Sequence, residues 1–389
     1  MARLLLVISA HGLGHLGQAA PVCNALVAAE PDLDLFIWSA LPLSVLRQRI
    51  QTPFTHYPVP CDIGFMMHDA LQVDVAASWS LYWQREQQWA TSLDTACTWV
   101  REIQPDLIVS DVGELPLAAG QALGIPTVAM SSLNWADLAR AYFANMSESA
   151  PVLHRLDQIY AQTTRALRLT PGMPMHGQRE TIMPPVGAVS TWSRAALDPL
   201  LAPHLPYPDQ PRILIGMGGI ETRLPWESWP TQSAFNLLVT NQPVLPGNGD
   251  PARGIVNADT LRSAYGWSFC DLLAGCDAVI CKPGYGTFVE AALANTPVLY
   301  VRRSDWPEQP VLIEWLHAQA RCAELAPATL QNGLFTNALR ALWQQAPKAP
   351  VPRDGAELAA REILTLLPSI SAGSPVAPAA AQSHAPANP

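Results

Sequence analysis

The sequence contains little charge. Asp, Glu, Lys and Arg make up only 14% of its 389 residues, against 49% hydrophobic residues. This composition excludes a wholly disordered chain and disfavours a coiled coil. The 23 Lys and Arg residues are outnumbered by 32 Asp and Glu residues, which gives a net charge of −9. Because nucleic-acid binding draws on basic surface, we expect no nucleic-acid partner.

Long hydrophobic runs and closely paired cysteines are also missing. No apolar stretch reaches the roughly 18 residues that cross a bilayer. The apolar start Leu4–Ile8 is too short for a signal-peptide core, and a glycine loop follows it. Seven scattered cysteines, without zinc-ribbon spacing, favour reduced thiols in a cytoplasmic protein. We therefore expect a cytoplasmic chain without a transmembrane segment. Peripheral membrane contact and the oligomeric state stay open.

Short apolar runs alternate with helical stretches, which is the pattern of a parallel α/β fold. The expected strands of the first half are Arg3–Ser9, Leu35–Ser39, Leu107–Ser110 and Thr127–Met130. The expected strands of the second half are Arg212–Gly216, Ala278–Cys281 and Val298–Arg302. The helices expected between them include 15–30, 115–123 and 287–294. The sequence therefore predicts two Rossmann-like parallel-sheet domains that face a cleft.

The chain length suits two to three domains, at about 150 residues each. Between residues 145 and 187 the strand–helix pattern stops and Pro and Gly cluster, which is typical of a connector with few contacts. We expect a first domain over 1–187 and a second over 188–350. A helix over 351–367 is expected to pack back on the first domain. The Ala/Pro/Ser-rich stretch 368–389 reads as a disordered tail.

A glycine loop follows the first expected strand and opens a helix. It contains Gly12, Gly14 and Gly17 in a GxGxxG pattern, which suggests a dinucleotide site. Such a site needs an acid at the end of the next strand to hold ribose hydroxyls. That strand ends in Trp38–Ala40 without an acid. A nicotinamide or flavin enzyme is therefore disfavoured.

Two histidines in this loop indicate proton-transfer chemistry. His11 and His15 lie at the expected carboxyl edge of the sheet, where open α/β sheets bind ligands. His15 opens the helix and is the stronger candidate for a general base. Asp111 ends another strand at the same edge and is placed to orient the imidazole. The alternatives are histidines bonded to loop backbone and an Asp111 that caps a helix.

The second half carries a sharper motif, the sequence Pro-Gly-Tyr-Gly-Thr that ends at Thr287 between a strand and a helix. The backbone N–H groups of Gly286 and Thr287, with the Thr287 hydroxyl, form an anion site that suits a diphosphate. Glu290, one turn further, is placed to accept hydrogen bonds from ribose hydroxyls. Its alternative role is helix capping. Lys282 precedes the glycines, so the segment is not a P-loop.

Two further loops are expected at this edge of the second sheet. Gly218 and Gly219 follow its first strand, and their small size lets backbone N–H groups approach phosphate oxygens. Glu308 and Gln309 follow a later strand and offer the acceptors and donors that a polyhydroxylated sugar needs. In the same loop, Arg303 either supports phosphate charge or is solvated.

Together these motifs resemble those of two-domain GT-B glycosyltransferases. The resemblance is greatest to the group with lipid II-forming N-acetylglucosaminyltransferases and to the glycosyltransferase-like N-terminal half of plant L-arabinokinases. The matching segments, in order over about residues 1–365, are His11–His15, Asp106–Val112, Lys282–Thr287, Val301–Arg303 and Glu308–Pro310. Gln18 stands where the arabinokinase-like pattern has Arg. The kinase half has no counterpart, so sugar phosphorylation is not carried over.

The resemblance implies a division of the site between the two halves. Acceptor binding falls to the loop of His11, Gly12 and Gly14, with His15 as the base and Asp111 behind it. Donor binding falls to Gly218, Gly219, Gly286, Thr287, Glu290, Glu308 and Gln309.

We therefore expect inverting transfer of a hexosyl or N-acetylhexosaminyl group from a nucleoside diphosphate sugar, UDP-linked by analogy, to a hydroxyl or amine. No cofactor or metal is expected, because the helix terminus takes over a metal's electrostatic role. The Asp-x-Asp motif at Asp32–Asp34 precedes a strand and reads as a surface turn. The alternatives are a nucleotide-sugar epimerase of the same fold and an inactive sugar-nucleotide-binding protein.

Overall fold

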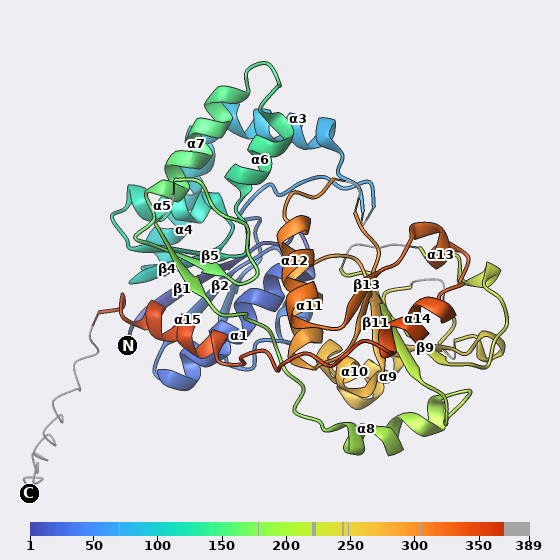
Figure 1. Cartoon of the computed structure of the whole chain (residues 1–389). Helices are drawn as coiled ribbons and strands as arrows, with labels where there is room; N and C mark the ends of the chain where they lie inside the picture. The colour runs from blue at the N-terminus through green and yellow to red at the C-terminus, as the bar shows by residue number, and fades with distance from the viewer. Residues whose placement is uncertain are drawn as a thin grey trace, which may run out of the picture.

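The computed structural model describes residues 1–69, 71–177, 179–219, 223–242, 245–247, 249–303 and 305–368. Two parallel sheets, one from each half of the chain, lie side by side with helices around them (Figure 1). The fold class expected from the sequence is therefore confirmed. Apart from Pro368, the stretch expected to be a disordered tail lies outside the described residues.

The first sheet has seven parallel strands in the order β3-β2-β1-β4-β5-β6-β7. The strands are β1 (Arg3–Ile8), β2 (Asp34–Trp38), β3 (Thr55–Tyr57), β4 (Leu107–Asp111), β5 (Thr127–Ser131), β6 (Arg165–Leu169) and β7 (Glu180–Met183). The helices of this half are α1 (Leu13–Ala29), α2 (Leu43–Leu46), α3 (Val75–Gln87), α4 (Trp89–Ile103), α5 (Glu114–Ala122), α6 (Trp135–Phe143) and α7 (Ser149–Ala161). The central strands are apolar without alternation because helices bury both faces of a parallel sheet.

The second sheet has six parallel strands in the order β10-β9-β8-β11-β12-β13. The strands are β8 (Arg212–Gly216), β9 (Asn236–Val239), β10 (Ile255–Asn257), β11 (Ala278–Cys281), β12 (Val298–Tyr300) and β13 (Cys322–Glu324). The remaining helices are α8 (Arg194–Leu201), α9 (Ala258–Tyr265), α10 (Phe269–Gly275), α11 (Tyr285–Leu293), α12 (Gln309–Gln319), α13 (Pro327–Gln331), α14 (Thr336–Trp343) and α15 (Gly355–Leu364).

The expectation of a connector with few contacts over 145–187 is wrong for most of that interval. It holds α7, β6 and β7, and the two strands complete the first sheet. Of the Pro and Gly residues that suggested a connector, those at 171–177 lie between these short strands and those at 184–187 follow β7. Arg165 and Arg168 interrupt the apolar character of β6, which hid the strand from a search for hydrophobic runs.

The last described helix returns to the first half. Helix α15 packs against α1 and β7 (Figure 1), and Arg165 forms an ion pair with Glu362. The returning chain also contacts the segment that leaves the first sheet. A Cβ atom on Gly355 would lie only 2.2 Å from the Pro185 carbonyl oxygen, so this crossing needs glycine. The two segments that connect the halves, one around Pro185 and one around Gly355, therefore lie in contact.

In each sheet, the chain reverses its direction of strand addition between two adjacent strands. In the first sheet these strands are β1 and β4, and in the second they are β8 and β11. Ligands of open α/β sheets bind beyond the carboxyl ends of the strands at such points. Ile8 is paired with Asp111, and Gly216 with Cys281, so each reversal point brings two loops together.

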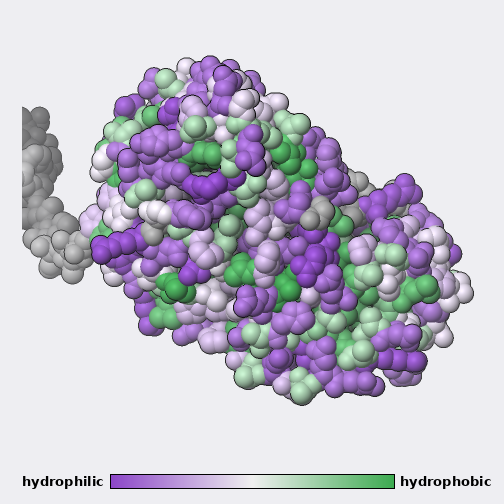
Figure 2. Space-filling view, turned by 45° about the horizontal axis from the view of Figure 1, so that its top comes forward, coloured by the Kyte–Doolittle hydropathy of each residue, from purple (hydrophilic) through white to green (hydrophobic). Residues whose placement is uncertain are grey.

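The seven cysteines are free and buried. Figure 2 shows hydrophilic and hydrophobic side chains interspersed over one face of the molecule, with the hydrophobic ones in small groups. Among the described helices, none combines the length and apolar character that crossing a bilayer requires.

Candidate active site

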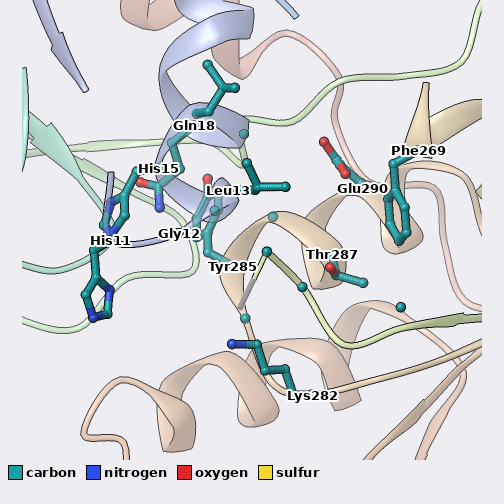
Figure 3. Close-up of a pocket in the computed structure, with 18 of the residues that line it drawn as sticks. His11, Gly12, Leu13, His15, Gln18, Phe269, Lys282, Tyr285, Thr287 and Glu290 are labelled. Atoms are coloured by element: carbon teal, nitrogen blue, oxygen red, sulfur yellow. The ribbon is translucent and has the colours of Figure 1, made fainter. Parts of the chain in front are cut away.

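One cavity lies between the two sheets and is lined from both halves (Figure 3). The N-terminal ends of α1 and α11 approach each other across it. A Cβ atom on Gly17 would lie 3.8 Å from the Gly286 Cα, and one on Gly286 would lie equally far from the Gly14 Cα. The two glycine motifs of the sequence therefore meet in space. Bulky residues at these positions would fill the gap between the helices.

His15 and Asp111 form a buried pair at the first reversal point. His15 Nδ1 lies 3.0 Å from Asp111 Oδ2, at the ends of α1 and β4 that the register of the sheet brings together. Burial favours neutral His15, but the Asp111 carboxylate outweighs it and raises the pKa of His15. Burial raises the pKa of Asp111, because it disfavours the charged carboxylate. With Nδ1 directed at the carboxylate, Nε2 is the imidazole nitrogen left to accept a proton.

His11 has a different role from His15. Its Nε2–H donates to the Phe65 carbonyl oxygen at 2.9 Å, and its ring stacks on Trp306 with 5.8 Å between centroids. Burial and the neighbouring His15 lower the pKa of His11 to about 3, so it stays neutral near pH 7. His11 therefore shapes the cavity wall as a neutral ring, next to His15 at 6.2 Å between centroids.

The turn before α11 supplies backbone donors to the cavity. Gly284 is the residue before the helix, in extended conformation, and as a glycine it provides no side-chain cap to the first turn. The N–H groups of that turn have no partner within a helix, which makes them available to an anion. Gly284, Gly286 and Thr287 all line the cavity, and Thr287 is labelled in Figure 3.

The loop after β8 forms another wall of the cavity through Gly218 and Gly219. Gly218 has φ +90°, which L side chains rarely adopt, and a Cβ atom there would lie 2.9 Å from the Lys282 Cε. A Cβ atom on Gly219 would lie 2.6 Å from Leu13 Cγ, so loops of the two halves touch here. Phe269 also lines the cavity, and a Cβ atom on Gly216 would lie 2.9 Å from its ring.

Glu290 lines the cavity but already has a partner from the first half. Arg49 Nη1 lies 2.5 Å from Glu290 Oε1, and both side chains are largely buried. The carboxylate raises the pKa of Arg49. No local pattern in the sequence marks Arg49, because its partner is 241 residues away along the chain. A ribose that binds Glu290 has to share or replace this ion pair.

Glu308 and Gln309 are placed differently from each other. Glu308 lines the cavity. Its carboxylate accepts a hydrogen bond from the Ser132 hydroxyl at 2.6 Å and another from the Trp306 indole at 3.2 Å. Gln18 donates to the same Ser132 hydroxyl at 3.1 Å, so a hydrogen-bond chain joins the halves. Gln309 is not among the described lining residues. Its amide holds the backbone of Arg303 and so fixes the loop.

Among the described residues, the second half lines the cavity with three basic side chains, those of Arg262, Lys282 and Arg303. Burial and the neighbouring Arg303 lower the pKa of Lys282 to about 7. Arg303 is 6% exposed, and its guanidinium lies 4.2 Å from the centre of the Trp306 ring. The sequence left open whether Arg303 is solvated, and the structure buries it. Burial could not be read from the sequence, because Arg302 beside it is exposed.

No protein-family model matches the chain. A curated relative, L-arabinokinase of Arabidopsis thaliana, is 26% identical over 363 residues, which cover 91% of this chain and 33% of the relative. The chain therefore spans about a third of the length of that relative.

Solved structures align with nearly the whole chain. The glycosyltransferase of kitacinnamycin has a TM-score of 0.60 at 14% identity, covering 94% of this chain and 99% of its own. UGT89C1 of Arabidopsis thaliana, complexed with UDP, has a TM-score of 0.53 at 11% identity, covering 93% and 94%. The chain therefore has the fold of GT-B glycosyltransferases. The resemblance read from its motifs, including that to arabinokinase, is confirmed.

Proposed function

We propose that the chain is a glycosyltransferase that moves a sugar from a nucleoside diphosphate sugar to an acceptor hydroxyl or amine. One observation carries the proposal: His15, with Asp111 behind it, and the turn before α11 face the same cavity from opposite halves. A base on one side and an anion site on the other suit a displacement at an anomeric carbon between them.

In the proposed step, His15 Nε2 takes the proton of the acceptor as its oxygen or nitrogen attacks the anomeric carbon. The bond from that carbon to the diphosphate oxygen breaks, and the diphosphate leaves with the electron pair. The first-turn N–H groups of α11 and the Thr287 hydroxyl stabilise its charge, as does the Lys282 ammonium. A single in-line displacement inverts the anomeric configuration. We propose that no metal is needed, because these donors take its place.

We further propose a UDP-linked hexosyl or N-acetylhexosaminyl donor. The aligned structure of UGT89C1 is complexed with UDP, which supports uridine as the base. Glu290 and Phe269 are assigned to the ribose and the base, and Glu308 to the sugar. The free, buried cysteines support a cytoplasmic location.

The first test measures thermal unfolding of the full chain in the presence of UDP, dTDP or GDP. A ligand at 100 times its dissociation constant should stabilise the chain by about 2.7 kcal/mol. Release of UDP from UDP-sugars only when an acceptor is present supports transfer. Inversion of a sugar centre without acceptor supports an epimerase instead, and binding of none of the three nucleotides contradicts the proposal.

Replacing the base tests the mechanism. His15→Ala should lower turnover by about 10²–10⁴ while UDP affinity stays nearly unchanged, because general-base help is lost but the diphosphate turn is intact. Initial rates and calorimetry measure the two quantities. His154→Ala, on the exposed surface of α7, is the matched control and should keep full turnover. Unchanged turnover in His15→Ala removes His15 from the mechanism.

A further inference from the structure

Arg303 carries hydrogen-bond donors that the described residues leave unused. Its Nε and Nη2 are buried and have no hydrogen-bond partner among these residues. Leaving a buried charged donor unpaired costs more than a net hydrogen bond contributes, so such groups are rare in native proteins. Because Arg303 also lines the cavity, a group that enters from outside is the expected partner.

The two unused donors form a ready-made fork. Nε and Nη2 lie on one edge of the planar guanidinium, and two parallel N–H groups there match the two oxygens of a carboxylate or phosphate. The loop holds this edge in place. Gln309 fixes the Arg303 backbone through bonds of 2.6 and 3.2 Å, and the Trp306 ring under the guanidinium is itself bonded to Glu308.

The charges around the fork favour an anion. Three acids attract Arg303: Asp305 and Asp69, which are not among the described lining residues, and Glu308, which lines the cavity and is already engaged by Ser132 and Trp306. Lys282 adds a second basic group to the same wall, and its charge interacts with that of Arg303. His11, on the Trp306 ring, is neutral. An anion bound at the fork would thus reduce repulsion between two buried basic side chains.

The position of the fork is near the reacting groups. Trp306 joins Arg303 to His11, and His11 lies beside His15. Phe269 and Glu290, assigned above to the base and ribose, belong to a different wall formed by α10 and α11. The fork is therefore placed near the sugar or the acceptor.

We propose that Arg303 binds a carboxylate or phosphate group carried by the transferred sugar or by the acceptor, separate from the donor diphosphate. The inference rests on the proposed function, because it uses the same cavity and the same pair of substrates. It narrows the substrate class to a uronosyl donor or an acidic sugar acceptor.

The donor arm of the test is calorimetry of the full chain with UDP, UDP-glucose and UDP-glucuronic acid. If the anion is on the donor, UDP-glucuronic acid binds about 10- to 100-fold more tightly than UDP-glucose. Arg303→Gln abolishes that preference and leaves UDP affinity within about threefold. Arg303→Lys keeps the charge but loses the fork, so it restores the preference only in part.

The acceptor arm uses protein saturated with UDP and titrated with glucose, glucuronate and glucose 6-phosphate. If the anion is on the acceptor, an acidic sugar binds about tenfold or more tightly than glucose, and Arg303→Gln removes the difference. Arg302→Gln is the matched control in both arms. Arg302 is exposed and paired with Glu324 outside the cavity, so its loss should change neither preference.

Three outcomes are decisive. UDP binding without an Arg303-dependent preference for acid in either arm overturns the inference alone. A loss of UDP affinity in Arg303→Gln equal to the loss of UDP-glucuronic acid affinity assigns Arg303 to the diphosphate, which also overturns it. Failure of the parent chain to bind UDP, dTDP or GDP overturns the proposed function, and the inference with it.

Discussion

For single residues, burial and the nearest charge together set the protonation states of the two cavity histidines. His15 and His11 are neighbours of the same residue type, yet their pKa values shift in opposite directions. Burial acts on both, but only His15 has the Asp111 carboxylate within 3.0 Å. His15 is thus a candidate base whose pKa lies above its ordinary value, and His11 is a neutral ring in the cavity wall.

This difference predicts the pH dependence of transfer. His15 acts as a base only when neutral, and Asp111 raises its pKa, so the rate of the parent chain should rise with pH through a value above 6.5. In Asp111→Asn the carboxylate is gone but burial remains, so the pKa of His15 falls and the acidic limb moves to lower pH. The plateau should fall by about 10²–10⁴, because the imidazole loses its orienting partner.

The measurement is kcat against pH for both chains. Asp32→Asn, on an exposed turn outside the cavity, should reproduce the parent profile. An acidic limb of Asp111→Asn that stays in place or moves to higher pH would contradict the assigned partner.

Among the helices and strands, α11 both lines the cavity and contacts the first half. Its first turn presents N–H groups to the cavity, and its first residue, Tyr285, ties the helix to the first half. The Tyr285 hydroxyl accepts from the Val186 N–H at 2.9 Å and donates to the Thr170 carbonyl oxygen at 3.1 Å. The diphosphate turn is thereby held at a fixed place relative to the segment that joins the sheets.

Tyr285→Phe should lower the free energy of unfolding by about 1–3 kcal/mol, because the Val186 N–H and the Thr170 carbonyl lose a buried partner. Denaturant unfolding measures the loss. The backbone donors of α11 remain, so UDP affinity should change little. Tyr265→Phe removes a hydroxyl bonded to His204 at the surface and should cost about 0.5 kcal/mol or less. Equal losses in the two variants would contradict the role of Tyr285.

At the scale of the whole molecule, polar contacts between the halves close the cavity. Arg49 reaches Glu290, and Ser132 reaches Glu308. Each pairs a residue of the first half with one that the sequence assigned to the donor. The same carboxylates therefore join the two halves and are the assigned acceptors for the donor.

Breaking the first of these pairs should destabilise the chain. Arg49→Met leaves Glu290 buried without its cation, at a cost of about 3–5 kcal/mol in the free energy of unfolding. A double Arg49→Met, Glu290→Met variant should recover much of that loss, since both charges are then gone. Denaturant unfolding of the two single variants and the double variant gives the coupling energy. Arg223→Met, in an exposed pair with Glu227, should cost about 1 kcal/mol or less.

The Arg49→Met variant also tests whether Glu290 binds the ribose of UDP. If ribose hydroxyls take the place of Arg49, Arg49→Met should bind UDP at least as tightly as the parent chain, while Glu290→Met should bind it more weakly. Weaker binding by Arg49→Met than by Glu290→Met would assign the nucleotide contact to Arg49 instead.

The sequence was sufficient to predict the two-sheet fold, because apolar strands followed by glycine loops and helices are local patterns. It also placed His15, Asp111 and the turn ending at Thr287 at sheet edges, since the carboxyl ends of parallel strands share one edge. It did not recover six short strands, β3, β6, β7, β9, β10 and β13. Of these, β6 and β7 are partly charged segments next to Pro and Gly residues and lack such a pattern.

Which side chains meet across the halves depends on how the two halves pack against each other. Arg49 reaches Glu290 because α1 and α11 come together, and no local pattern encodes a partner 241 residues away. Arg303 and its exposed neighbour Arg302 are the same residue type in one loop, so burial alone separates them. Gln309 follows Glu308 directly, yet only Glu308 turns to the cavity, because the loop backbone takes up the Gln309 amide.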